Sequence, residues 1–245
     1  MTYDLLIKNG TVVDGSGNPG YRADVGVSGG KIAAIGRINE RAKQTIDAEG
    51  HIVSPGFVDG HTHMDAQIFW DPIGSCSSYH GVTSVVMGNC GFTLAPCKQE
   101  DADMVFRNLE RAEDLSRDAM LEGIDWRWET FPEFLDVIDD LPKGINYAGY
   151  IGHSALRTYV MGERAFSDAA GEDDVRQMQH LVKQAMHAGA IGFATSRTFN
   201  HLTADDRPVA SRIAEWDEVR AIVNAVGETG KGLFEIAGEA PGRDP

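Results

Sequence analysis

The chain has 245 residues, 42% of them hydrophobic and 24% charged, a balance typical of a globular protein. A net charge of -15 argues against nucleic acid or an anionic membrane as partner. No apolar run reaches the roughly 18 residues of a membrane span, the N-terminus has no signal-peptide pattern, and the three cysteines are an odd number. We therefore expect a cytoplasmic protein without disulfides.

Short apolar runs separated by turn residues occupy positions 3–50. Asn9-Gly10 follows such a run and predicts a hairpin turn, because both residues tolerate a positive φ. A second turn is predicted at 28–30. Residues 1–51 are therefore predicted to form a small β-rich segment, part of a composite β-sandwich.

From residue 52 onward, strand-like runs alternate with helical patterns. This alternation is typical of an α/β fold, with a parallel sheet covered by helices. A closed barrel needs eight βα units, so residues 52–245, with about five, predict a (β/α)8 TIM-type barrel that is incomplete. The predicted strands are 52–58, 83–88, 146–151, 190–195 and 232–237, and the predicted helices are 104–120, 130–141, 172–188 and 215–229.

Two histidines follow the first of these strands, in the segment PGFVDGHTHMD at 55–65. His61 and His63 are two residues apart, so in extended chain their side chains point to the same face. At the carboxyl end of a barrel strand, that face is where barrel enzymes keep their active sites. Two neutral imidazoles suit a divalent ion such as Zn²⁺, although a His-X-His pair on its own is a weak signal.

A cysteine follows the next predicted strand, in the segment HGVTSVVMGNCGFTLAP at 80–96. Because neighbouring parallel strands end at the same edge, we expect Cys90 near the two histidines. Free cysteines are often core residues, but glycines on both sides favour a ligand here.

These two segments resemble the metal-binding motifs of the metal-dependent amidohydrolase superfamily, and in particular of its D-aminoacylase (N-acyl-D-amino-acid deacylase) family. The resemblance implies a metal-dependent hydrolase of non-peptide C–N bonds that deacylates N-acyl-D-amino acids, a small-molecule substrate. It implies one or two Zn²⁺ ions held by His61, His63 and Cys90, with the cysteine as a shared ligand in place of a carbamylated lysine. No lysine follows the fourth predicted strand, which agrees with this.

Further segments extend the likeness to nearly the whole chain, among them GHSALR at 152–157 and GFATSRT at 192–198. The resemblance makes His153, Arg157 and Arg197 candidates for substrate binding, and a guanidinium suits a substrate carboxylate. A buried network that holds the loop is an equal alternative for His153 and Arg157. His201 is predicted to be solvated, and Asp65 to cap a loop or orient the histidines.

The chain departs from the family pattern after residue 232. The fifth predicted strand contains Glu235 and no histidine, and neither a sixth-strand histidine nor the eighth-strand aspartate that serves as general acid/base lies within the 245 residues. The predicted site is therefore incomplete, and activity of these residues alone is not expected. The alternatives are a non-catalytic metal-binding scaffold and another amidohydrolase acting on a cyclic amide or a dipeptide. Open strand edges predict that these residues alone either aggregate or form a homo-oligomer.

Overall fold

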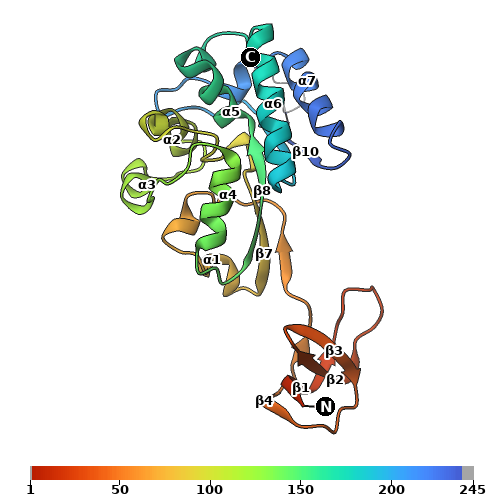
Figure 1. Cartoon of the computed structure of the whole chain (residues 1–245). Helices are drawn as coiled ribbons and strands as arrows, with labels where there is room; N and C mark the ends of the chain where they lie inside the picture. The colour runs from red at the N-terminus through yellow and green to blue at the C-terminus, as the bar shows by residue number, and fades with distance from the viewer. Residues whose placement is uncertain (1, 239–245) are drawn as a thin grey trace. The chain divides into compact units, whose positions relative to one another are not determined.

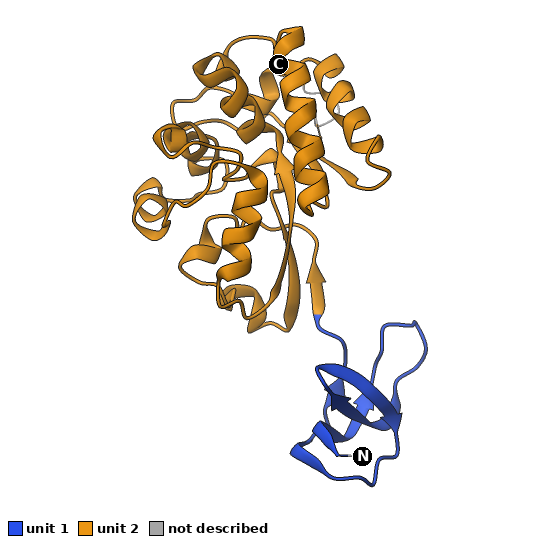
Figure 2. Ribbon diagram, in the orientation of Figure 1, with its two compact units in different colours: residues 1–56 blue, residues 57–245 orange. Residues whose placement is uncertain are grey.

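The computed structural model describes residues 2–238 (Figure 1). The chain divides into two compact units, Met1–Gly56 and Phe57–Pro245 (Figure 2). None of the helices among the described residues is long and apolar enough to cross a membrane.

The first unit is a five-stranded sheet in the order β3-β2-β1-β4, with β5 paired to the end of β1. Tyr3, Leu6 and Ile38 form its small core. Its strands are β1 (Tyr3–Val12), β2 (Tyr21–Ser28), β3 (Lys31–Gly36), β4 (Ala42–Asp47) and β5 (Ile52–Val53).

One of the two predicted turns in this unit is wrong. Asn9 has the expected positive φ of 62°, but it lies inside β1, where the register against β2 shifts between Ile7 and Gly10. The Asp24 carboxylate accepts the Asn9 N–H at 2.9 Å, which satisfies the bulged backbone within the sheet. The other turn is confirmed: Gly29 and Gly30, at φ 58° and 73°, connect the antiparallel strands β2 and β3.

The second unit is built on a parallel sheet, as predicted, in the order β10-β9-β8-β7-β6. Helices and loops cover this sheet (Figure 1). The strands are β6 (Phe57–Asp59), β7 (Val82–Met87), β8 (Asn146–Gly152), β9 (Gly192–Ser196) and β10 (Leu233–Ala237). The α-helices are α1 (Ser75–Ser78), α2 (Ala102–Glu110), α3 (Arg117–Gly123), α4 (Phe131–Asp140), α5 (His153–Met161), α6 (Glu172–Ala188) and α7 (Trp216–Gly227). Short 3-10 helices are η1 (Gln67–Phe69), η2 (Asn89–Gly91), η3 (Gln99–Asp101), η4 (Gly162–Phe166) and η5 (Ala210–Ile213).

The first predicted strand, 52–58, is two strands in two different sheets. β5 pairs with β1 in the first unit, whereas β6 pairs with β7 in the second. The chain between them contains Pro55 and Gly56. Proline has no N–H to donate to a sheet and glycine is conformationally free, so the strand breaks there.

The predicted helix 104–120 is also two helices, α2 and α3. Between them Asp114 has a φ of 53°, which an α-helix cannot accommodate. Ser116 then caps α3, its hydroxyl oxygen accepting the Ala119 N–H at 3.4 Å. The break places Glu113 in a loop, with consequences for the site described below. The helices predicted at 130–141, 172–188 and 215–229 are confirmed as α4, α6 and α7, whereas α5 was not predicted.

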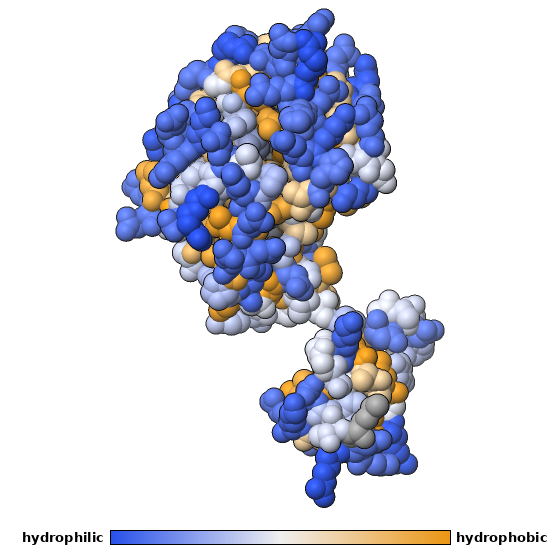
Figure 3. Space-filling view, in the orientation of Figure 1, coloured by the Kyte–Doolittle hydropathy of each residue, from blue (hydrophilic) through white to orange (hydrophobic). Residues whose placement is uncertain are grey.

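The two outer strands of the parallel sheet are exposed. Within the described residues, β6 pairs with β7 alone and β10 with β9 alone. Their apolar side chains are largely accessible: Phe57 is 65% exposed, Val58 70% and Leu233 59%. Figure 3 shows apolar patches among the polar surface of this unit. Exposed apolar edge strands of this kind are sites where further strands can pair.

Candidate metal centre

The two histidines and the cysteine come together beyond the carboxyl ends of β6 and β7. The Cys90 Sγ atom lies 3.5 Å from His61 Nε2 and 4.0 Å from His63 Nε2. The two imidazole rings lie 5.2 Å apart, centre to centre. One potential ligand atom from each of the three side chains lies within 4.8 Å of the others. Their proximity follows from the parallel pairing of β6 and β7.

Cys90 stands in a turn of unusual backbone conformation. Gly88, Cys90 and Gly91 all have positive φ, at 78°, 58° and 79°. A side chain at Gly91 would place its Cβ 3.0 Å from the carbonyl oxygen of Ala194, so glycine is required there by the close approach of β9. For a cysteine, the left-handed conformation costs about 1 kcal/mol or more. Strained positions of this kind cluster at functional sites.

Three side chains connect the histidine loop to this turn. The Thr62 hydroxyl donates to the Val86 carbonyl at 2.8 Å, and the Asn89 amide donates to the Thr62 carbonyl at 3.1 Å. The Asp65 carboxylate accepts the Gly88 N–H at 3.0 Å. Complete burial raises the pKa of Asp65 to about 7. Asp65 therefore joins the two loops, which positions the histidines indirectly.

Three further side chains face this cluster. The Glu113 carboxylate lies 3.3 Å from His63 Nε2 and 3.9 Å from His201 Nε2. The Glu235 carboxylate accepts the Cys90 N–H at 2.8 Å and lies 4.0 Å from His61 Nδ1. Glu113 was hidden inside a predicted helix, and the prediction that His201 is solvated is wrong, because its side chain is only 14% exposed. The structure turns the Glu235 side chain toward the cluster.

Burial dominates the electrostatics of the cluster. It lowers the pKa of His63 to about 4, with help from the charges of His61 and His201. It lowers the pKa of His201 to about 4 and raises the pKa of Glu113 to about 7. Burial, followed by the charges of Glu235 and Glu113, raises the pKa of Cys90 to about 12. Without a cation, the cluster therefore disfavours its charged forms.

These residues fit a divalent metal ion. Neutral imidazole nitrogens and a cysteine sulfur are the donors that zinc prefers. His63 Nδ1 is buried and has no hydrogen-bond partner among the described residues, while Nε2 of the same ring faces Cys90 and Glu113. A bound cation lowers the pKa of a thiol that coordinates it, so that the thiol is deprotonated. Burial disfavours the Cys90 thiolate when no ion is bound, but it would strengthen the attraction between that thiolate and a bound ion.

His153 and Arg157 lie elsewhere, in a buried network with Glu218. The three side chains are almost fully inaccessible, and His153 Nε2 donates to Glu218 Oε1 at 2.9 Å. The Arg157 guanidinium donates to the same carboxylate and, at 2.7 Å, to the Asp168 carbonyl. This geometry favours the buried-network alternative for both residues, because Arg157 has no accessible face to offer a substrate. Nothing in the described contacts supports a substrate role for them.

Arg197 is also engaged by the protein itself. Its guanidinium donates to the carbonyls of Arg212 and Ala214 and lies 5.2 Å from the centre of the Trp216 ring. These contacts hold the segment after β9 against the start of α7. A substrate role for Arg197 stays a prediction.

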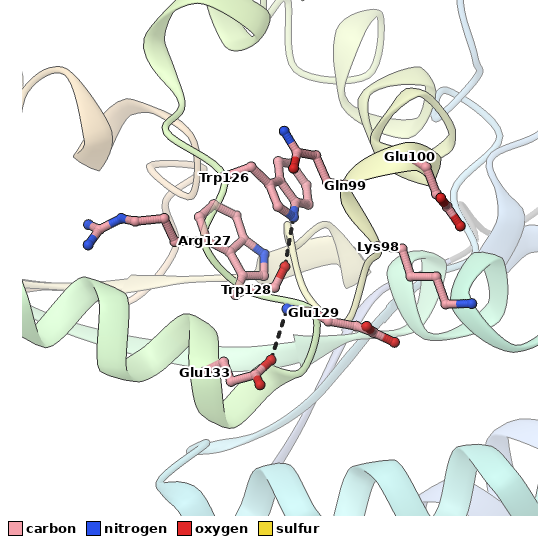
Figure 4. A pocket seen from close by; sticks show the side chains of 8 residues that line it. All are labelled: Lys98, Gln99, Glu100, Trp126, Arg127, Trp128, Glu129 and Glu133. Carbon is pink, nitrogen blue, oxygen red and sulfur yellow. Dashed lines mark hydrogen bonds between the residues drawn. The ribbon is translucent and has the colours of Figure 1, made fainter.

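A separate surface hollow of about 470 Å³ lies beside Trp126 and Trp128 (Figure 4). The two indoles stack with ring centres 4.5 Å apart, and the Trp126 Nε1–H donates to the Trp128 carbonyl. The Glu133 carboxylate accepts the Glu129 N–H as part of the cap of α4. None of the residues that line this hollow belongs to the histidine–cysteine cluster.

The fold and the cluster together define a class: an α/β protein with potential metal ligands at the carboxyl ends of parallel strands. A model described as the amidohydrolase family matches residues 44–240. The chain therefore belongs to the amidohydrolase family, and the resemblance to its D-aminoacylase members is confirmed by the relatives that follow.

The chain is 39% identical to a D-aminoacylase of Alcaligenes xylosoxydans over 194 residues, which are 79% of this chain and 37% of that relative. A solved D-aminoacylase structure, described as having a binuclear metal centre, matches with a TM-score of 0.74 and 34% identity over 95% of this chain and 44% of that one. An N-acyl-D-glutamate deacylase from Bordetella bronchiseptica, complexed with zinc and a phosphonate inhibitor, matches with a TM-score of 0.78 and 29% identity over 99% and 47%. The chain thus spans less than half the length of these relatives.

Because His153 is buried in the network with Arg157 and Glu218, we expect the stability of the protein to depend on pH. Burial lowers the pKa of His153, against the opposing effect of Glu218. In the unfolded chain a histidine titrates near about 6.5, so on acidification the unfolded state takes up this proton first. The stability contribution is present above that pH and is lost as the pH falls. We expect His153→Gln to reduce the slope of unfolding free energy against pH by up to ~1.4 kcal/mol per unit.

Urea unfolding at several pH values from about 7.5 to about 5 measures this slope. His180→Gln, an exposed histidine on α6, should leave the slope unchanged. Equal slopes for wild type and His153→Gln would contradict the prediction.

Proposed function

We propose that this chain carries the metal-binding part of a hydrolase that deacylates N-acyl-D-amino acids. The observation that carries the proposal is the convergence of His61, His63 and Cys90 at the carboxyl ends of adjacent parallel strands. The relatives named D-aminoacylase and N-acyl-D-glutamate deacylase indicate the class of substrate, a linear amide. The zinc complex of the latter relative favours zinc, as one ion or two.

In this proposal the chain's own residues have separate tasks. His61, His63 and Cys90 hold the ion, and a bound divalent ion supplies Lewis-acid activation of an amide carbonyl and of water. Asp65 and Thr62 keep the histidine loop against the cysteine turn. Glu235 fixes the cysteine backbone by accepting its N–H. We further propose that β6 to β10 are five strands of an eight-stranded barrel, since both outer strands are exposed and the relatives are more than twice as long.

A non-catalytic metal-binding scaffold uses the same three ligands, and turnover separates it from a hydrolase. The test is the release of free amino acid from N-acetyl-D-glutamate, N-acetyl-D-methionine and their L-enantiomers, with zinc added. It is run on this chain and on any longer protein that contains it. We expect hydrolysis of the D-enantiomers by the longer protein, lost in His61→Ala. Stoichiometric metal without hydrolysis of any N-acyl amino acid would favour the scaffold.

A further inference from the structure

We infer that the surface hollow beside Trp126 and Trp128 binds a free amino acid in its zwitterionic form. Its volume of about 470 Å³ lies within the range of small-molecule pockets. The inference goes beyond the proposed function, because it assigns a second site, outside the histidine–cysteine cluster, in which no bond is broken. It takes from the proposed function only the choice of probe, D-methionine, which is the amino acid that hydrolysis of N-acetyl-D-methionine would release.

The indole pair offers a ligand an apolar surface. Trp128 stacks on Phe69 at 5.1 Å and on Trp126 at 4.5 Å, so the three rings form one continuous stack. Each indole N–H already has a backbone acceptor: Trp126 donates to the Trp128 carbonyl at 2.8 Å, and Trp128 donates to the Leu94 carbonyl at 2.9 Å. The rings therefore have only π faces and apolar edges left for a ligand, and Trp126 is only half-buried. Such a surface suits an apolar or thioether side chain.

Among the described residues, charges of both signs line the same hollow without pairing with one another. The Lys98 ammonium and the Glu100 carboxylate have no hydrogen bond or ion pair within residues 2–238. The Glu129 carboxylate accepts the Tyr159 hydroxyl at 2.7 Å through Oε1, which leaves Oε2 for another donor. Figure 4 shows the side chains of Lys98, Glu100 and Glu129 pointing to one side of the indole pair. That side of the hollow therefore offers an ammonium and two carboxylates to a ligand.

The other charged groups of the hollow are engaged by the protein itself. The Glu133 carboxylate accepts the N–H groups of Glu129 and Thr130 at 2.9 and 2.8 Å, where it caps α4. The Arg127 Nε lies 3.2 Å from the Asp125 carboxylate, and Figure 4 shows the Arg127 side chain extending away from the other charges. Recognition of a ligand thus depends on the indoles, the ammonium and the two carboxylates described above.

A zwitterion is the class of ligand that satisfies this arrangement. A simple cation is repelled by Lys98, and a simple anion is repelled by Glu100 and Glu129. An amino acid can place its carboxylate against Lys98 and its ammonium against Glu129, each in a charge-assisted hydrogen bond. Its side chain then packs on the indole pair, and the thioether of methionine makes favourable contacts with aromatic rings.

The test is a titration of the metal-free full chain with D-methionine, followed by the ¹H–¹⁵N signals of its four indole N–H groups. We expect the signals of Trp126 and Trp128 to shift on one saturation curve, with a dissociation constant on the order of 1 mM. The signals of Trp70 and Trp216 should stay in place. Replacing each tryptophan singly by phenylalanine assigns the four signals.

Lys98→Ala and Glu129→Gln should each weaken binding by about 3- to 10-fold. Two analogues separate the tasks of these residues. D-methioninamide lacks the carboxylate and should be insensitive to Lys98→Ala, whereas N-acetyl-D-methionine lacks the ammonium and should be insensitive to Glu129→Gln. The matched controls are Lys231→Ala and Glu122→Gln, both at exposed positions, and they should bind D-methionine as wild type does. Circular dichroism verifies that each variant is folded.

The possible failures are distinct. If D-methionine shifts neither the Trp126 nor the Trp128 signal, or shifts all four signals alike, the hollow is not an amino-acid site and the inference is overturned. If Lys98→Ala and Glu129→Gln both bind as wild type does, the recognition of a zwitterion is overturned. Because the chain is metal-free, none of these results depends on the proposed function, which fails separately if no N-acyl amino acid is hydrolysed.

Discussion

Replacing Cys90 with alanine is expected to remove bound metal and, with it, hydrolysis. Cys90 is the one side chain common to both potential ligand groups among the described residues. Lewis-acid stabilisation by a metal ion contributes several kcal/mol to a transition state. Since ~1.4 kcal/mol corresponds to tenfold in rate, we expect turnover to fall by about 10³-fold or more in the catalytically complete protein. Zinc per chain, measured by elemental analysis beside the rate, checks both parts.

Cys97→Ala is the matched control for this experiment. Cys97 is also a free, buried cysteine, only 2% exposed; its thiol donates to the Lys98 carbonyl at 3.2 Å, and it belongs to neither potential ligand group among the described residues. Its replacement should remove packing contacts and lower stability, but it should leave the amount of bound metal unchanged. Retention of metal by Cys90→Ala, at an affinity equal to that of Cys97→Ala, would contradict the assignment of Cys90 as a ligand.

Of the substitutions proposed here, Glu218→Ala is expected to cause the largest loss in the free energy of unfolding, about 3–5 kcal/mol. The substitution leaves the guanidinium of Arg157 fully buried without its carboxylate and removes the acceptor of His153 Nε2. Burial by itself raises the pKa of Glu218, but the hydrogen bond from His153 and the charge and hydrogen bond of Arg157 lower it below its usual value. The carboxylate is thus held ionised between two buried partners. Urea unfolding at neutral pH measures the effect.

Two further variants on helix α7 serve as comparisons for Glu218→Ala. Glu218→Gln keeps a hydrogen-bond acceptor and should lose less stability than Glu218→Ala, which gives a second measurement if the alanine variant does not fold. Asp217→Ala breaks an exposed ion pair with Arg220 and should cost about 1 kcal/mol or less. Equal small losses for Glu218→Ala and Asp217→Ala would show that the buried network does not stabilise the fold.

Much of the fold and the centre of the candidate site could be predicted from local sequence patterns and from the family resemblance. The alternation of apolar strands with helical patterns predicted the parallel sheet, and the pattern over 130–141 predicted helix α4, which the Thr130–Glu133 capping box starts in the structure. The approach of His61 and His63 to Cys90 also followed from the sequence. In a parallel sheet the carboxyl ends of neighbouring strands meet at one edge, so motifs that directly follow two adjacent strands must lie close together.

Only the tertiary structure decided the remaining contacts. Glu113 and His201 reach the cluster from loops whose paths depend on breaks such as the positive φ of Asp114. Glu218 meets His153 and Arg157 across more than 60 residues. Such contacts leave no periodic signal in the sequence, because they depend on how helices and loops pack and not on the direction of one strand. Sequence therefore determined that the three potential ligands follow two adjacent strands, whereas three-dimensional packing determined which carboxylates surround them and that Arg157 is buried.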